Sequence, residues 1–314
     1  MSRLTIGYLS TAYHTAFILK GGKWIKKRLK INPEWKLFPT GPAMVQAFSK
    51  GELDLGYIGL PPAMIGIDRG LKIKCVAGGH VEGTVIIALS KYQTFEELGT
   101  IESTLDQFRG HAIGTPSQGS IHDVILRWLI DGAGLTEKIN IKNFRWADFI
   151  LEALEDKVVV GGCGTPPLAV LASKYLDAKI VLPPHEIWPY NPSYGIVATI
   201  DIIKNASETL SGFLRLHEEA NNLMRDKPYE AVKLAAEEIG IVDEEFLLQV
   251  LRVSPKYCAS LPKEYTESTL AFVPILRKMG YISKHLDYNE VFHPDLINQI
   301  HKENPHYGNP GKLG

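Results

Sequence analysis

The sequence has little cysteine, and its three cysteines form no recognisable pattern. Cys75, Cys163 and Cys258 are odd in number and far apart, with no CxxC pair and no Cys/His spacing suited to zinc. This excludes a disulfide framework. We interpret all three as buried free thiols, with a single bridge left open for an oxidising compartment. We expect no metal and no cofactor.

The chain also lacks long hydrophobic runs and an excess of charge of one sign. No window approaches the roughly 18 consecutive apolar residues of a membrane span. Its 34 Lys+Arg balance 35 Asp+Glu, for a net charge of −1. Such a balance gives no long-range attraction for nucleic acid or for an anionic membrane surface. We therefore expect neither nucleic acid nor a direct membrane span.

The N-terminal residues show no apolar signal-peptide core and no small-residue cleavage site. They are typical of a first β-strand instead. Two expectations for the compartment follow. The protein is periplasmic or at the cell surface if this chain is a processed mature form, and cytoplasmic if Met1 is the native start.

The order of apolar patterns predicts an α/β protein. At 314 residues and 45% hydrophobic content, two domains or one large α/β unit are expected. Up to about residue 200, short apolar runs alternate with helical periodicity. The expected strands are 4–9, 35–38, 53–58, 73–77, 85–89, 111–114, 139–144, 158–160, 180–182 and 194–198.

Beyond residue 207 the pattern is almost entirely helical. The expected helices, delimited by proline and glycine, are 210–224, 229–239, 244–253 and 266–279. Residues 304–314 are rich in Gly, Pro and Asn, and we expect them to form a poorly ordered tail.

Several predicted strands end in small or hydroxyl-bearing loops that open directly into helices. In an open α/β sheet, ligands gather at the carboxyl ends of strands, where helix N-termini present unpaired N–H groups. Taken singly, such residues are ordinary caps and turns. Their recurrence in both halves of the α/β region favours ligand binding. These residues are Ser10, Thr11, Thr40, Gly41, Gly59, Leu60, Pro61, Thr115, Ser117, Gly119 and Ser120.

No catalytic signature accompanies these loops. The sequence has no GxSxG elbow, no GxxxxGK[ST] phosphate loop, no HExxH and no GxGxxG after the first strand. His14, His80 and His122 lie beside strand ends, where an imidazole acts as a base, contacts a ligand or is purely structural. Residues 161–167, GGCGTPP, are interpreted as a glycine-rich turn for close backbone approach. Cys163 as a nucleophile is the second interpretation.

Aromatic residues, rather than arginines, accompany the candidate site. Tyr13, Trp188 and Tyr194 suit a flat heterocycle. Arg127 and Arg145 are the nearest arginines in sequence, so a bidentate guanidinium clamp is not indicated. Neutral donors and helix N-termini favour a small anion such as a sulfonate or carboxylate.

A longer segment resembles a known family. Residues 40–62, TGPAMVQAFSKGELDLGYIGLPP, resemble the helix–GE(I/L)D–strand–G–x–P segment of type II periplasmic substrate-binding proteins. The opening IGY strand, LKIKCVAG at 71–78 and GHAIGTPSQGS at 110–120 agree in order. Within that group the chain is similar to the NMT1-like branch, which binds sulfonates, taurine, nitrate or thiamine-pyrimidine precursors for ABC importers. The resemblance covers residues 3–280.

The resemblance implies a two-lobed α/β fold. Each lobe would be a mixed, mainly parallel sheet flanked by helices, with a hinge of two crossover strands near 85–90 and 194–199. Lobe 1 would comprise 1–88 and 197–284, lobe 2 would comprise 89–196, and 285–314 would be a C-terminal extension with a flexible end. The ligand would lie between the lobes, and closure would present a changed surface to a membrane permease. Besides the strand-end residues, its contacts would include Tyr13, His14, His80, His122, Cys163 and Tyr194.

Three functions stay open. We favour a non-enzymatic solute-binding component of an ABC importer that clamps a small anionic or heteroaromatic metabolite. The alternative is a cytosolic enzyme on the same scaffold, similar to the pyrimidine synthase of thiamine biosynthesis, although the CCCFC-type segment of that family has no counterpart here. The effector-sensing half of a regulator is a weaker hypothesis, because no helix-turn-helix segment precedes the first strand. Residues 162–164 depart from the acidic or aromatic residue usual in the family, which leaves the ligand open.

Overall fold

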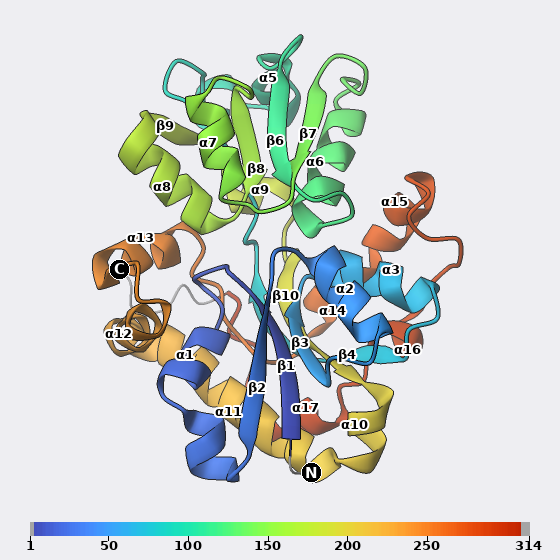
Figure 1. Cartoon of the computed structure of the whole chain (residues 1–314). Helices are drawn as coiled ribbons and strands as arrows, with labels where there is room; N and C mark the ends of the chain where they lie inside the picture. The colour runs from blue at the N-terminus through green and yellow to red at the C-terminus, as the bar shows by residue number, and fades with distance from the viewer. Residues whose placement is uncertain (1–2, 309–314) are drawn as a thin grey trace.

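Two five-stranded sheets form the centres of two lobes. The computed structural model describes residues 3–308. In Figure 1 the second lobe lies above the first, and helices flank both sheets. The strand orders are β2-β1-β3-β10-β4 in the first sheet and β7-β6-β8-β5-β9 in the second. This arrangement confirms the predicted two-lobed α/β fold.

The first sheet is mixed and lies at the centre of the first lobe. β1 pairs in parallel with β2 and β3, whereas β10 runs antiparallel to β3 and β4. All four residues of β3 are buried, as expected for a central strand covered on both faces. The strands are β1 (Arg3–Leu9), β2 (Asn32–Phe38), β3 (Leu55–Ile58), β4 (Ile73–Val81) and β10 (Pro192–Thr199).

The second sheet repeats this mixed pattern. β6 pairs in parallel with β7 and β8, whereas β5 runs antiparallel to β8 and β9. The strands are β5 (Val85–Leu89), β6 (Ala112–Pro116), β7 (Asn140–Phe144), β8 (Gly161–Gly164) and β9 (Ala178–Leu182).

β8 corrects the interpretation of GGCG as a turn. All four of its residues are buried in the middle of the second sheet, and the predicted strand at 158–160 is instead the bend that leads into it. A Cβ on Gly162 would lie 2.8 Å from Cγ2 of Ile150. The helix that carries Ile150 can therefore pack against the strand only because Gly162 has no side chain.

The strand limits also move the boundary between the lobes. Residues 85–88, expected in lobe 1, belong to β5 of the second sheet, and residues 192–196, expected in lobe 2, belong to β10 of the first. β4 continues to Val81 instead of ending at Ala77, so His80 is a strand residue. Gly79 makes this possible, because a Cβ there would lie 2.1 Å from Cε2 of Tyr194.

The helices of the α/β region begin where small or hydroxyl residues end a strand. Thr40 is extended and a proline follows in the first turn, while the side chain of Ser120 accepts a hydrogen bond from the Asp123 N–H. The helices are α1 (Ala16–Gly21), the π-helix η1 (Ile25–Leu29), α2 (Gly41–Ser49), α3 (Leu60–Asp68), α4 (Phe95–Leu98), α5 (Ile101–Asp106), α6 (Ile121–Gly132), α7 (Phe149–Glu155), α8 (Pro166–Leu176) and α9 (Pro184–Ile187).

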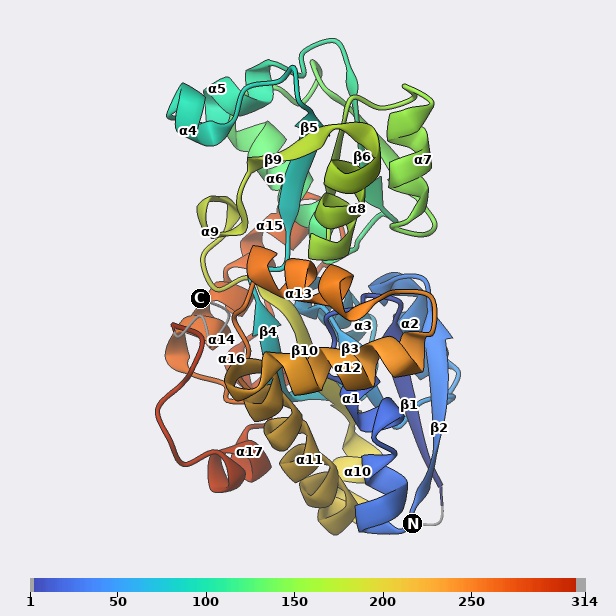
Figure 2. The ribbon, with the colours of Figure 1, turned by 90° about the vertical axis from the view of Figure 1, so that its left-hand side faces the viewer.

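The C-terminal third is helical, as predicted, and packs on both lobes. The long helix α11 lies against the first lobe, and α13 contacts α8 of the second (Figure 2). The predicted helix at 266–279 is divided at Ala271, because Pro274 has no N–H to bond the Leu270 carbonyl. The helices are α10 (Ile200–Asn205), α11 (Ser207–Asp226), α12 (Pro228–Ile239), α13 (Glu244–Val253), α14 (Lys263–Leu270), α15 (Phe272–Lys278), α16 (Tyr288–Val291) and α17 (Asp295–Ile300).

The C-terminal extension packs on the first lobe as far as it is described. The His293 N–H donates to the Cys75 carbonyl at 2.8 Å. Tyr307 is 1% exposed, and its hydroxyl donates to the Cys258 carbonyl at 2.6 Å. The prediction of a poorly ordered tail is therefore wrong for residues 304–308, and its remainder, 309–314, lies outside the described residues. Within 3–308, no helix has the length and apolar content needed to cross a bilayer.

Candidate functional site

A cavity of about 60 Å³ lies between the two lobes, where loops from both sheets meet. The first lobe contributes Leu9, Ser10, Thr11, Tyr13, His14, Pro39, Thr40, Gly41, Gly59, Pro62 and Ser193. The second lobe contributes Pro116, Ser120, Ile121, His122, Ala147, Asp148, Thr165 and Pro167. We call this cavity the cleft.

The structure gathers about half of the predicted ligand-binding residues around the cleft. They come from three loops of the first lobe, after β1, β2 and β3, and one of the second, although the sequence separates the first from the last by more than a hundred residues. They are Ser10, Thr11, Tyr13, His14, Thr40, Gly41, Gly59, Ser120 and His122. Their contact with a ligand remains a prediction.

Other predicted residues lie beside the cleft but do not line it. Leu60 and Pro61 are buried in the first turn of α3, and Thr115 is buried at the end of β6. Gly119 has a φ of +79° and its N–H donates to Asp123 Oδ2 at 2.9 Å, so it acts as a turn residue. Ser117 belongs to the same turn, where its carbonyl accepts the Ser120 N–H at 3.0 Å.

His80 and Tyr194 form a layer behind the cleft wall. Both are fully buried, and the His80 ring stacks on Tyr194 with centroids 6.2 Å apart. Tyr13 and His14 cover this layer, with His14 4.1 Å from Tyr194 and Tyr13 4.8 Å from His80 between ring centroids. The buried pair therefore positions two cleft residues and does not face the cavity.

Cys163 is placed as a structural thiol. It is fully buried in β8, and its Sγ donates to the His122 backbone carbonyl at 3.5 Å, not to an imidazole. Burial raises the pKa of Cys163, and the nearby Asp123 charge raises it further. The thiol therefore stays protonated, and this geometry does not support the nucleophile interpretation.

Helix N-termini surround the cleft. Residues at the starts of α2, α3, α6, α7 and α8 all line it. Proline occupies the first turn of α2, α3 and α8, which removes N–H donors there. The start of α6 keeps them: Ile121 and His122 are its first two residues, whose N–H groups have no acceptor within the helix. An acceptor group of a ligand is best placed at this end of α6.

The cleft is lined by few ionisable side chains, and the one with a formal charge is acidic. Among the described residues that line it there is no lysine or arginine, and Asp148 is the one carboxylate. Arg127 is directed elsewhere, with its Nε 2.9 Å from Asp123 Oδ1 and its Nη2 3.1 Å from Asn143 Oδ1. Asp148 precedes α7 without capping it, and partial burial raises its pKa. Its oxygens are therefore available to a hydrogen-bond donor.

The cleft histidines are neutral at pH 7. Burial lowers the pKa of His122 to about 4, and its Nδ1 lies 3.0 Å from Thr84 Oγ1. Burial also holds the pKa of His14 well below its ordinary value, with a further contribution from His80. Both imidazoles therefore offer one donor and one acceptor instead of positive charge.

Sequence reasoning missed the contributions of two loops and of one strand. Asp148 follows β7 and Thr165 follows β8, so both obey the strand-end rule that found the other residues. Because GGCG was interpreted as a turn, Thr165 was not recognised as a strand-end residue. Ser193 lies at the start of β10, where no loop signal exists, and reaches the cleft because the chain crosses between the lobes just before this strand.

Two adjacent segments carry the chain between the lobes. Glu82 and Tyr190 both have left-handed backbone conformations, with φ of +59° and +57°. Glu82 Oε1 accepts the Tyr190 N–H at 3.0 Å, and its Oε2 lies 2.6 Å from Lys256 Nζ. This nearly buried carboxylate ties both crossings to the helical region, which is the arrangement expected of a hinge.

A larger cavity of about 680 Å³ lies between α8, β9 and α13. Its lining mixes apolar side chains with charged ones such as Lys174, Lys179 and Arg252, and it includes none of the strand-end residues. Within residues 3–308, loops from both sheets converge on the cleft, so we take the cleft as the candidate site.

The sequence profile described as the NMT1-like family matches residues 1–240. A Brucella abortus protein, named only as a binding protein, is 24% identical over 277 residues, which span 86% of this chain and 71% of that one.

Two solved structures share the fold. The alkanesulfonate-binding protein SsuA from Xanthomonas axonopodis superposes with a TM-score of 0.78 at 17% identity, covering 93% of this chain and 98% of that one. The periplasmic nitrate-binding protein NrtA from Synechocystis superposes with a TM-score of 0.77 at 12% identity, covering 99% of this chain and 91% of that one.

Proposed function

The chain belongs to the NMT1-like family, and on that premise we propose that it is the solute-binding component of an ABC importer. It would hold a small molecule in the cleft between its lobes and present the closed form to a membrane permease. The observation that carries this proposal is the cleft itself, where strand-end loops of both sheets converge at the hinge. The similar solved proteins include periplasmic ones, which supports a site of action outside the cytoplasmic membrane.

Closure of the lobes explains the small size of the cleft. Ligand sites typically measure about 300–1,000 Å³, whereas this cleft encloses about 60 Å³. Gly59 of the first lobe approaches Ile121 of the second so closely that a Cβ would lie 3.3 Å from Ile121 Cγ2. Opening about the segments at Glu82 and Tyr190 would admit a ligand, and closing would enclose it.

The cleft favours a ligand with two chemically different ends. Free N–H groups at the start of α6 suit a sulfonate, a carboxylate or a ring nitrogen. Asp148 suits an ammonium or amino group, and no basic side chain among the described lining residues competes for it. We therefore propose a small aminosulfonate or an aminopyrimidine over a simple anion such as nitrate.

Matched compounds test this assignment. Taurine and ethanesulfonate differ by one amino group, as do 4-aminopyrimidine and pyrimidine. The amino member of at least one pair is expected to bind about tenfold more tightly, because Asp148 pairs with the added group. Thermal unfolding with each compound measures this difference, since binding to the folded state raises the melting temperature.

Substitution of the carboxylate supplies the control. In Asp148→Asn the preference for the amino compound should disappear, whereas Asp156→Asn, at the exposed other end of α7, should preserve it. Equal binding within both pairs in the wild type would refute the role of Asp148. No stabilisation by any of these compounds or by nitrate at millimolar concentration would count against the solute-binding proposal as a whole.

A further inference from the structure

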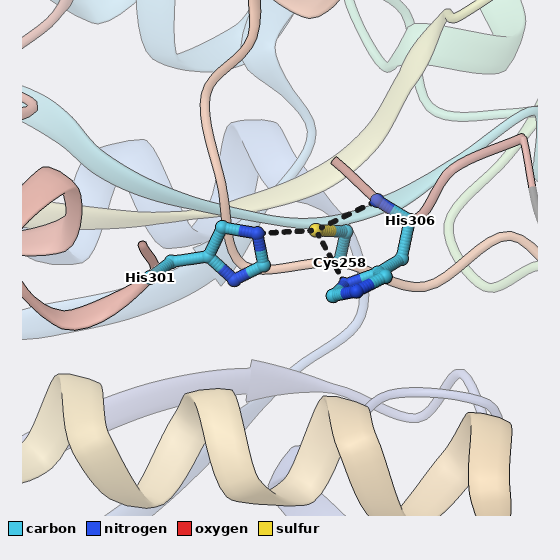
Figure 3. Close-up of side chains that lie close together, drawn as sticks. All are labelled: Cys258, His301 and His306. Atoms are coloured by element: carbon cyan, nitrogen blue, oxygen red, sulfur yellow. Dashed lines mark hydrogen bonds between the residues drawn. The ribbon is translucent and has the colours of Figure 1, made fainter. Parts of the chain in front are cut away.

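A cluster of one cysteine and two histidines lies in the first lobe, outside the cleft. Cys258 belongs to the segment after α13, His301 directly follows α17, and His306 lies near the end of the described chain. Figure 3 shows both imidazoles turned toward the sulfur. Cys258 Sγ is 3.8 Å from His301 Nε2 and 3.7 Å from His306 Nδ1. All three atoms lie within 4.8 Å of one another.

These separations match those of a tetrahedral zinc site. Zn–S bonds of about 2.3 Å and Zn–N bonds of about 2.0–2.1 Å, at tetrahedral angles, place sulfur and nitrogen about 3.6 Å apart. Both S···N distances in the cluster are within a few tenths of an ångström of that value. A zinc ion bonded to the sulfur and to either nitrogen would therefore need little change in the S···N distances.

Each histidine has a carboxylate at its other ring nitrogen. His301 Nδ1 lies 2.9 Å from Glu218 Oε1 on α11, and His306 Nε2 lies 3.4 Å from Glu303 Oε2. Metal-ligating histidines are usually oriented in this way, because the carboxylate fixes the tautomer and makes the ligating nitrogen more basic. The second oxygen of Glu218 is buried without a hydrogen-bond partner in the described structure. Two such pairs around one thiol are an independent sign of a metal site.

The burial of the cluster and the charges around it also suit a bound metal ion. Cys258 is fully buried and His301 is 9% exposed, whereas the His306 side chain is 21% exposed and leaves one side open. Ser260 Oγ lies 3.0 Å from the sulfur, which makes it a candidate for the fourth ligand. Arg225 is nearby, but its guanidinium is engaged by the Tyr257 carbonyl and Asn222. The two carboxylates and a thiolate outnumber this single positive charge.

We propose that Cys258, His301 and His306 bind one zinc ion, with water or Ser260 in the fourth position. Binding replaces the thiol proton, which is released to solvent. The ion would cross-link the C-terminal segment to the rest of the first lobe, next to the place where Tyr307 already anchors it. None of the three ligands lines the cleft, so the role assigned is structural and independent of the transported solute.

Cobalt titration of the full-length, EDTA-stripped protein tests the site. Co²⁺ is expected to bind at one ion per chain, with a thiolate-to-cobalt charge-transfer band and intense tetrahedral d–d bands, and Zn²⁺ is expected to displace it. Cys258→Ser should abolish the charge-transfer band. His306→Asn should weaken binding at least about 100-fold, and Glu303→Gln, at an exposed position, about tenfold.

Controls separate loss of the site from loss of the fold. His285→Asn removes an exposed histidine outside the cluster and should leave cobalt affinity unchanged. His306→Asn should keep the melting temperature of the metal-free protein, since the side chain is partly exposed. Cobalt spectra without a thiolate band, or equal affinity in wild type and folded His306→Asn, would overturn the proposal. Neither result would affect the solute-binding function.

Discussion

Lowering the pH from 7 to 4 is expected to unfold the protein, because four buried histidines take up protons far more readily in the unfolded chain. Burial lowers the pKa of His122 and His217 to about 4 and that of His80 to about 3, and it holds the pKa of His14 well below its usual range. In the unfolded chain each titrates near 6.5. Between about pH 6.5 and 4 the unfolded state therefore binds more protons, and stability falls as the pH falls.

The expected effect is large. One proton bound only by the unfolded state lowers the free energy of unfolding by about 1.4 kcal/mol per pH unit. The three histidines with stated values together give a slope of about 4 kcal/mol per pH unit, against a typical total stability of about 5–15 kcal/mol. Burial inside a layer of tyrosine rings lowers the pKa values of His80 and His217. It outweighs the opposite effect of the hydrogen bonds to the Ser254 and Gly78 carbonyls, both at 2.7 Å, which raise them.

Urea unfolding at pH 5, 6, 7 and 8 measures this slope. His122→Gln should reduce it by about 1.4 kcal/mol per pH unit, because one titrating group is removed. His285→Asn, at an exposed position, should leave it unchanged. A free energy of unfolding that stays constant between pH 7 and pH 5 would show that these histidines are not buried in their neutral form.

Replacing Ser10 by tryptophan is expected to abolish ligand binding while the fold is preserved. Ser10 lines the cleft and is exposed, and an indole is larger than the cavity of about 60 Å³. In Ser10→Trp the lobes could not close around a ligand, so we expect affinity to fall by more than about 100-fold, the loss that follows when enclosure fails. The melting temperature without ligand should stay within about 2 °C of the wild type.

A matched substitution separates blocking of the cleft from a general effect of tryptophan. Ser49 is also an exposed serine of the first lobe. It is the last residue of α2, whose first residue, Gly41, lines the cleft. Ser49→Trp should bind the ligand as the wild type does. Calorimetric titration of both variants with the compound that most stabilises the wild type makes the comparison. Unchanged affinity in Ser10→Trp would show that the ligand binds elsewhere.

Local patterns were sufficient to predict most of the fold. Alternation of apolar runs and helical periodicity located nearly every strand, and the GELDLGYIGLPP segment indicated the family. The errors occurred where tertiary contacts override local signals. GGCG resembles a turn, yet it is a central strand whose glycines admit Ile150 and Leu168 from the covering helices. Likewise, Gly78 and Gly79 suggested the end of β4, whereas they allow Tyr307 and Tyr194 to pack against a continuing strand.

The site was predictable only where strand ends were recognised. Thr40 and Ser120 lie after correctly located strands and line the cleft. Asp148 was missed, although it is the residue that we propose selects the ligand. The Cys258 cluster could not be predicted, because separations of 43 and 48 residues along the chain correspond to no known zinc spacing. Only the return of the C-terminal segment to the first lobe brings these side chains together.

Hydrogen exchange with and without ligand tests the central claim, that the cleft between the lobes encloses a solute. The measurement uses the wild-type chain saturated with the compound that gives the largest thermal stabilisation. We predict slower amide exchange in residues 9–14 and 40–41 of the first lobe and, at the same time, in residues 120–122 and 147–149 of the second. Protection confined to one lobe, or centred on α8 and α13 with the cleft loops unchanged, would contradict the account.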